Sequence, residues 1–130
     1  MGEGLARMRL GAAADALAPD GSEIRLLPKL AGGSMAHCTL PAGATSKAVK
    51  HRRVEEIWYM VSGRGEVWRK RAGHEEVVEV EPGVGLSIPY GTEFQFRALG
   101  PEPLVFVLVT MPPWPGEAEA VRVADHWPVE

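Results

Sequence analysis

The sequence contains one cysteine, Cys38, among its 130 residues, so no internal disulfide can form. Nothing in the cysteine content therefore indicates an oxidising compartment. Long hydrophobic runs are also missing, and no stretch approaches the roughly 20 apolar residues that a membrane helix needs. The alanine-rich stretch that follows Arg7 and Arg9 is interrupted by Asp15 and lacks the apolar centre of a signal peptide. These absences predict a cytoplasmic protein that has no membrane partner.

An excess of positive charge is the third absence. The formal net charge is -3, and the basic cluster around Arg52 is interspersed with acidic residues. Binding to nucleic acid depends on a surplus of lysine and arginine, so we expect no nucleic-acid partner. The hydrophobic fraction of 45% is ordinary for a globular chain, and 130 residues are enough for one domain with a buried core.

Glycine and proline, in contrast, are abundant, with 15 and 11 residues. They lie between short runs of alternating hydrophobicity, which is the pattern of turns in an all-β protein. Residues 12–17 are the exception, where we expect a short helical turn. Pro28 confines the first long strand to a sheet edge or a bulge. We expect strands at 23–30, 34–40, 56–61, 66–71, 74–81, 84–88, 93–98 and 104–111, which predicts a sandwich or a jelly-roll barrel.

The stretch from Gly43 to Gly63 is the most informative part of the chain. A glycine turn leads into a polar loop and then into a strand, in which Glu56, Trp58 and Met60 share one face. A carboxylate followed by large apolar groups on one face predicts a lined cavity with a polar group at its mouth.

Two motifs in the sequence resemble those of the cupin superfamily. In the first, Gly43 is followed after five residues by Val49-Lys50-His51, after four more by Glu56, and after six more by Gly63. In the second, Gly83 is followed after five residues by Pro89-Tyr90-Gly91 and after two more by Phe94. The resemblance implies an all-β jelly-roll barrel, or double-stranded β-helix, over residues 23–113. An N-terminal extension (1–22) and a C-terminal tail (114–130) would flank it.

The resemblance also implies four positions that hold a divalent metal in the family, and these fall on Val49, His51, Glu56 and Phe94. Valine and phenylalanine have no donor atom, whereas a transition-metal site needs three or more good ligands. We therefore expect no metal and no other cofactor. A divalent ion held by His51 and Glu56 with water or substrate stays an alternative.

His51 and Glu56 are the candidate catalytic residues, because a carboxyl and an imidazole against apolar surface can act as acid and base near neutral pH. We expect a small-molecule-binding cupin, an enzyme of isomerase, cyclase or lyase type that acts without metal on a small, largely apolar substrate. A non-catalytic ligand-binding or sensing module is the second hypothesis, and a metalloenzyme with the reduced ligand set is the third. The expected substrate-binding residues are Val49, Arg53, Trp58, Met60, Tyr90, Phe94 and Phe96.

The opposite face of the central strand, formed by Ile57, Tyr59 and Val61, is also apolar. A strand that is apolar on both faces needs cover, which the N-terminal strand or a second subunit can supply. We expect a homodimer.

Overall fold

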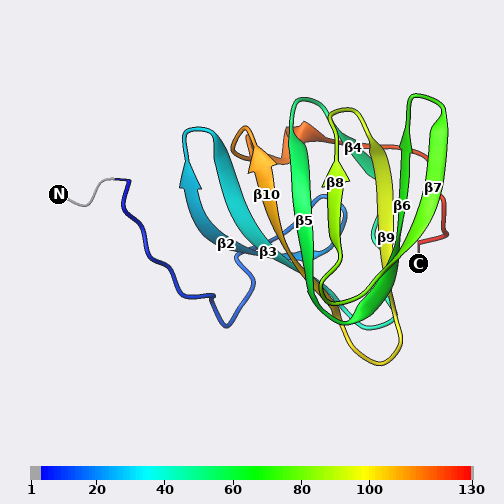
Figure 1. The fold of residues 1–130 in the computed structure, drawn as a ribbon, viewed down its shortest axis with the longest axis horizontal. Coiled ribbons are helices and arrows are strands. Elements are labelled where there is room, and N and C mark those ends of the chain that lie inside the picture. Colours follow the sequence, from blue (N-terminus) through cyan, green and yellow to red (C-terminus); the bar gives the residue numbers. More distant parts are fainter. Residues whose placement is uncertain (1–3, 130) are drawn as a thin grey trace.

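Two antiparallel sheets face each other in this computed structural model, which describes residues 4–129 (Figure 1). Sheet A has the strand order β1 (Ala16–Leu17), β2 (Glu23–Leu30), β3 (Gly33–Leu40), β10 (Leu104–Met111), β5 (Glu55–Ser62) and β8 (Gly85–Ile88). Sheet B has the order β11 (Ala120–Arg122), β4 (Val49–His51), β9 (Glu93–Leu99), β6 (Arg64–Arg71) and β7 (His74–Val80). A single 3-10 turn, η1 (Glu117–Glu119), precedes β11. The predicted all-β jelly roll is confirmed.

Glycine has a specific role at two corners of the barrel. At Ala72 and Gly73 the chain turns with φ values of 51° and 82°, the positive angles that a two-residue hairpin between β6 and β7 requires. At Gly63, φ is 81°, and an added Cβ would lie 2.0 Å from the carbonyl oxygen of Pro103. Any side chain at position 63 would therefore push apart the ends of β5 and β10.

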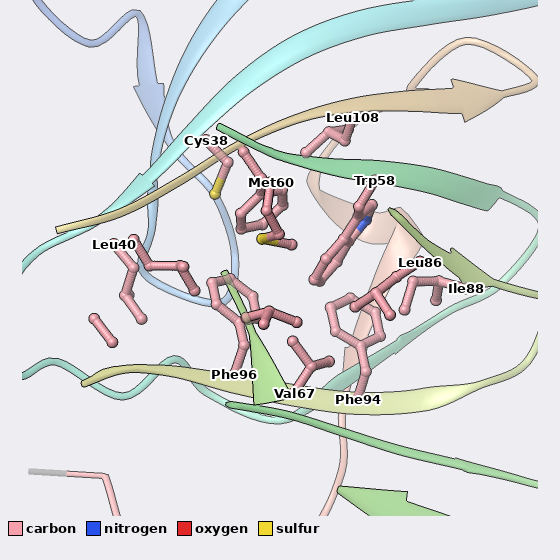
Figure 2. Close-up of a cluster of buried hydrophobic side chains, with 14 of the residues drawn as sticks. Cys38, Leu40, Trp58, Met60, Val67, Leu86, Ile88, Phe94, Phe96 and Leu108 are labelled. Carbon is pink, nitrogen blue, oxygen red and sulfur yellow. The ribbon is translucent and has the colours of Figure 1, made fainter. Parts of the chain in front are cut away.

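The core fills the space between the sheets with side chains from alternate positions of the strands. On β5, Trp58 and Met60 point inward and are fully buried, whereas Ile57 and Tyr59 point outward. Phe94 and Phe96 on β9 and Phe106 on β10 complete a cluster of aromatic rings with the indole of Trp58. Figure 2 shows these side chains converging from both sheets, with the sulfur of Cys38 close to Met60. Cys38 is thus a buried core residue, and burial raises the pKa of its thiol well above the ordinary value.

Two parts of the chain differ from the sequence-based expectation. The helical turn predicted at 12–17 is wrong, because Ala16 and Leu17 form β1 and pair with β2. The polar loop contains a strand, β4, which pairs with β9 and with β11. Local patterns did not indicate either strand: β1 is two residues long and pairs with the nearby β2, whereas β4 is a strand through its pairing with the distant β9 and β11. Pro28 does lie at a bulge, between Leu26 and Lys29 in the β2–β3 ladder.

The C-terminal tail is part of the barrel rather than a loose end. After β11, the side chain of the fully buried Gln95 accepts the N–H groups of His126 and Trp127 at 2.8 Å. The ring of His126 stacks on Trp68 at 5.2 Å between centroids, and the Arg97 guanidinium lies 4.3 Å from the centre of Trp127. These contacts fix the tail on the outer face of sheet B.

The outer face of sheet A stays open. Ile57 and Tyr59 are 55% and 56% exposed, and Val61 and Met35 beside them are also exposed. The N-terminal strand does not cover this face, because β2 pairs edge to edge with β3 and extends the same sheet (Figure 1). The homodimer stays a prediction. Within residues 4–129, no helix has both the length and the apolar character to cross a membrane.

Candidate active site

His51 and Glu56 meet at one end of the barrel although they belong to different sheets. His51 is the last residue of β4 in sheet B, and Glu56 is the second residue of β5 in sheet A. The short link between them is held by Glu119, whose carboxylate accepts the backbone N–H groups of Arg53 and Val54, the latter at 2.7 Å. This link folds the chain from one sheet to the other and places both side chains inside.

The two side chains form a buried pair whose polar atoms are only partly used. Nδ1 of His51 lies 3.6 Å from Oε2 of Glu56, a distance longer than a hydrogen bond, and this nitrogen has no hydrogen-bond partner. The other oxygen of Glu56 accepts the indole N–H of Trp58 at 2.7 Å. Both residues are only 6% exposed. Nδ1 of His51 is therefore available to a ligand, while Trp58 holds the carboxyl in place.

Burial shifts the two groups in opposite directions. Loss of hydration lowers the pKa of His51 to about 4, although the carboxylate of Glu119 acts in the other direction. Loss of hydration raises the pKa of Glu56 to about 8, which the Trp58 hydrogen bond opposes and the charge of Asp20 reinforces. At neutral pH the pair is thus a neutral imidazole beside a protonated carboxyl.

These shifts predict how stability depends on pH. The pKa of Glu56 is higher in the folded state than in the unfolded one. Its contribution to the free energy of unfolding is therefore fully present below pH 4.5 and is lost as the pH rises to about 8. The pKa of His51 is lower in the folded state, so its contribution is present above pH 6.5 and lost as the pH falls to about 4. Between pH 4.5 and 6.5 the two groups change the free energy of unfolding in opposite directions, and their effects cancel. Above pH 6.5 only the effect of Glu56 continues. We expect the free energy of unfolding to fall by about 2 kcal/mol from pH 6.5 to 8.

Urea denaturation at a series of pH values measures this fall. Glu56→Gln should remove most of it, whereas Glu79→Gln, which changes an exposed carboxylate on β7, should keep it. Equal pH slopes in wild type and Glu56→Gln would contradict the predicted shift.

Aromatic rings and a threonine complete the surroundings of the pair. The ring of His51 meets Phe94 at 5.2 Å and Trp114 at 5.0 Å, both edge to face. Thr110 on β10 is buried directly opposite Glu56 in the β5–β10 ladder. The rings around His51 are apolar, whereas the hydroxyl of Thr110 lies opposite Glu56 and the charges of Glu119 and Asp20 act on the pair.

The predicted substrate-binding residues fall into two groups. Five of them lie in the packed core, each at most 2% exposed: Val49, Trp58, Met60, Phe94 and Phe96. Of these, Phe94 contacts the ring of His51, and Val49 is opposite Phe94 in the β4–β9 ladder. Met60 and Phe96 belong to the same buried core cluster, in which Phe96 meets Trp58 edge to face (Figure 2).

The other two predicted residues lie on the surface. Tyr90 is 57% exposed in the turn between β8 and β9, and the side chain of Arg53 is 72% exposed, with its Nε 3.5 Å from Glu119. Two hollows lie at the opposite end of the barrel, one lined in part by Gly65 and Val84 and the other in part by Gly63 and Gly100. The assignment of these seven residues to substrate binding stays a prediction.

Trp114 and Glu119 are site residues that the sequence did not indicate. Both follow the last long strand, and their contacts to His51 and to the 52–54 link span more than sixty residues of chain. The one local signal is the composition of 112–116, in which a tryptophan stands among three prolines and therefore cannot belong to a regular strand.

The donor set does not fit a metal centre. The positions corresponding to the family's first and last ligands, Val49 and Phe94, are buried apolar neighbours in the β4–β9 ladder. Across residues 4–129, no group of three or more histidine, cysteine, aspartate or glutamate side chains is arranged to hold a metal ion. His37 is on the outward-facing side of β3, and His74 is an exposed partner of Glu76. No histidine therefore replaces the missing ligands.

The fold and site define a class of protein: a small jelly-roll barrel with a His-Glu pair at one end. The family model of the cupin domain matches residues 36–110. The chain is also 33% identical over 103 residues to an uncharacterized protein of Methanocaldococcus jannaschii, covering 75% of this chain and 79% of that relative. The chain belongs to the cupin family.

Solved structures with low sequence identity share the fold. Pac13, a nucleoside dehydratase, is similar with a TM-score of 0.69 at 14% identity, covering 91% of this chain and 92% of that one. Oxalate decarboxylase from Bacillus subtilis, a protein with Mn(II) centres, is similar with a TM-score of 0.69 at 18% identity. That match covers 85% of this chain and 30% of the decarboxylase. At these identities the likeness concerns the fold alone.

Proposed function

We propose that this cupin is an enzyme that transfers a proton on a small, largely apolar molecule, with Glu56 as the acid and His51 as the base. The reaction is of isomerase, cyclase or lyase type and uses no metal held by the protein. The replacement of two family ligand positions by Val49 and Phe94 supports the last point, since no other side chain within residues 4–129 takes their place.

The burial of the pair, with Nδ1 of His51 3.6 Å from Oε2 of Glu56, is the observation that supports this proposal most directly. An acid must carry its proton and a base must lack one, and ordinary pKa values give the reverse between pH 4.5 and 6.5. Here burial raises the pKa of Glu56 to about 8 and lowers that of His51 to about 4. Both groups are therefore ready to react across this whole interval.

The proton balance of one turnover follows from these states. Nδ1 of His51 takes a proton from an acidified C–H bond of the substrate, and the carboxyl of Glu56 gives its proton to the oxygen that gains the electron pair. The pair is then an imidazolium and a carboxylate, 3.6 Å apart in the resting structure. Return of a proton from His51 to Glu56, directly or through the product, restores the starting state.

The surroundings of the pair suggest the kind of substrate. Phe94 and Trp114 place aromatic rings beside His51, and no lysine or arginine among the described residues pairs with Glu56. A planar or cyclic molecule with one carbonyl or hydroxyl group suits such an enclosure, because a fully charged one would lose its hydration without compensation. Pac13 is named as a dehydratase, and loss of water is one reaction that a neutral acid and base can promote.

Hydrogen exchange tests this function before the substrate is identified. The wild-type protein is incubated in D2O with a panel of cyclic ketones, enones and hydroxyketones, and each compound is analysed by mass spectrometry. We expect deuterium to enter at least one compound class next to the carbonyl group, faster than in buffer alone. No catalysed exchange and no conversion across the panel, with binding to some of its members, would favour the non-catalytic ligand-binding hypothesis.

A further inference from the structure

Residues 112–116 cover His51 without belonging to either sheet. The segment reads Pro112-Pro113-Trp114-Pro115-Gly116, and proline has no N–H group to offer a neighbouring strand. From Pro112 to Pro115 the only backbone donor is therefore the N–H of Trp114. It donates to the hydroxyl of Ser34 at 3.0 Å. One hydrogen bond thus holds the middle of this segment to the barrel.

Both ends of the segment are firmly anchored. Before it, β10 is paired on both sides, with β3 and with β5. After it, Glu119 accepts the N–H groups of Arg53 and Val54 through its carboxylate and that of Arg52 through its backbone carbonyl. Between these anchors, residues 112–116 are the part that we expect to move. Gly116, with φ of 137°, is a backbone position that can change conformation at low cost.

Trp114 contacts His51 from a segment that is not a barrel strand. Phe94 and Glu56 belong to β9 and β5, each of which is hydrogen-bonded to a strand on either side. Because His51 and Glu56 are almost fully buried, a substrate reaches them only if part of this enclosure moves. Displacing Trp114 breaks one backbone hydrogen bond, whereas displacing a strand breaks a ladder.

The attachment point of the segment lies in the same row of side chains as the acid. Ser34 of β3, Thr110 of β10 and Glu56 of β5 are consecutive partners across sheet A, with all three side chains on its inner face. The hydroxyls of Ser34 and Thr110 are hydrogen-bonded to each other. The same row of side chains therefore holds both the segment and the surroundings of Glu56.

We propose that residues 112–116 are a lid over the His51–Glu56 pair, with Ser34 as its latch and Trp114 as its specificity-determining residue. The lid opens by releasing the Trp114 N–H from Ser34, and the indole then forms one wall of the bound substrate. The assignment of substrate contact rests on the proposed function, whereas the opening itself does not. A ligand that replaces the indole edge beside His51 must present an apolar, preferably planar, group there.

Chemical labelling of histidine tests the opening without any substrate. Diethylpyrocarbonate acylates neutral imidazole, and peptide mass spectrometry reports the rate at each histidine separately. In the wild type we expect His51 to react much more slowly than His74, whose side chain is 77% exposed. Ser34→Ala should raise the rate at His51 about 3- to 10-fold, as expected for loss of one hydrogen bond. The rate at His74 should not change.

Three further variants make the result specific. Ser87→Ala, an exposed serine on β8, is the matched control and should label like the wild type. Trp114→Ala should raise the rate at His51 more than Ser34→Ala does, and Trp114→Phe, which keeps a ring there, should raise it less than Trp114→Ala. Circular dichroism checks that each variant is folded. If Trp114→Ala is unfolded, the labelling rate of Ser34→Ala alone tests the opening.

The lid proposal is contradicted if His51 reacts as fast as His74 in the wild type, or if Ser34→Ala leaves the rate at His51 unchanged. These outcomes are separable from failure of the proposed function. Absence of catalysed deuterium exchange would refute the proton-transfer reaction, while histidine labelling could still show the opening. Catalysed exchange without the expected labelling pattern would refute the lid and leave the proposed reaction intact.

Discussion

Replacing Glu56 by glutamine is expected to lower the rate of the proposed reaction by about 10²- to 10⁴-fold, the usual contribution of a general acid or base. Glutamine keeps the shape of the side chain and still accepts the indole N–H of Trp58, but it has no proton to give. Binding of substrate should change little. The measurement is the rate of deuterium exchange or turnover at saturating substrate, with Glu55→Gln as control, since Glu55 is the exposed neighbour on the same strand.

Loss of His51 should cause a similar decrease. His51→Phe keeps an aromatic ring against Phe94 and Trp114 while removing Nδ1. Because the two groups act as one unit, the double variant should be little worse than either single one. In the wild type, the rate should be constant between pH 4 and 8, falling above about 8 as Glu56 loses its proton and below about 4 as His51 gains one.

The same assay separates the three hypotheses. Full activity in Glu56→Gln would refute its role as the acid. Activity lost on treatment with a chelator and restored by a divalent ion would assign the reaction to a metal held by the reduced ligand set. Ligand binding that is unaffected by both substitutions, with no catalysed exchange, would indicate the binding module.

Trp58→Ala is expected to reduce the free energy of unfolding by about 3–5 kcal/mol, the range for removing a large aromatic side chain from a core. The indole stacks on Phe106 at 4.3 Å and meets Phe94 and Phe96 edge to face, both at 5.4 Å. Its removal also leaves the buried Glu56 without a donor. Since a domain of this size is stable by about 5–15 kcal/mol, this loss is a large share of the total.

Urea denaturation of matched variants measures this loss. Trp58→Phe keeps a ring in the cluster, so it should reduce the free energy of unfolding less than Trp58→Ala does. Because it removes the indole N–H, it should also raise the pKa of Glu56 further. Tyr90→Ala, at an exposed aromatic residue, should change stability by less than about 0.5 kcal/mol. A loss below about 1 kcal/mol in Trp58→Ala, accompanied by a loss of ligand affinity, would instead show that the indole lines a binding site rather than the core.

Much of the fold was predictable from local patterns. Alternation on β5 placed Glu56, Trp58 and Met60 on the inner face, and the glycine and proline corners located most of the long strands. These features depend on residues that are near one another in the chain, so a sequence pattern can carry them. The apolar outer face of the same strand was also predictable, and the structure leaves it exposed.

The candidate site was predictable in its two central residues and in the aromatic residues of β5 and β9 that contact them. His51 and Glu56 stand out because both occupy positions of the first family motif. That motif is a short, continuous stretch of sequence, so it can be recognised without the structure. Trp114 and Glu119 belong to no such motif, since their contacts with His51, Arg53 and Val54 join segments more than sixty residues apart. β4 likewise exists because β9 and β11 pair with it. Short strands of this kind have little propensity of their own.

By itself, the sequence determined an all-β barrel, the inward row that begins at Glu56, and the replacement of two family ligand positions by Val49 and Phe94. The tertiary structure alone decided that the pair is enclosed, and this burial raises the pKa of Glu56 and lowers that of His51. Hydration is lost only when Phe94 from sheet B, Trp58 from sheet A and Trp114 from the tail close around the two groups. A pKa shift caused by burial is a property of that enclosure, and no pattern of neighbouring residues contains it.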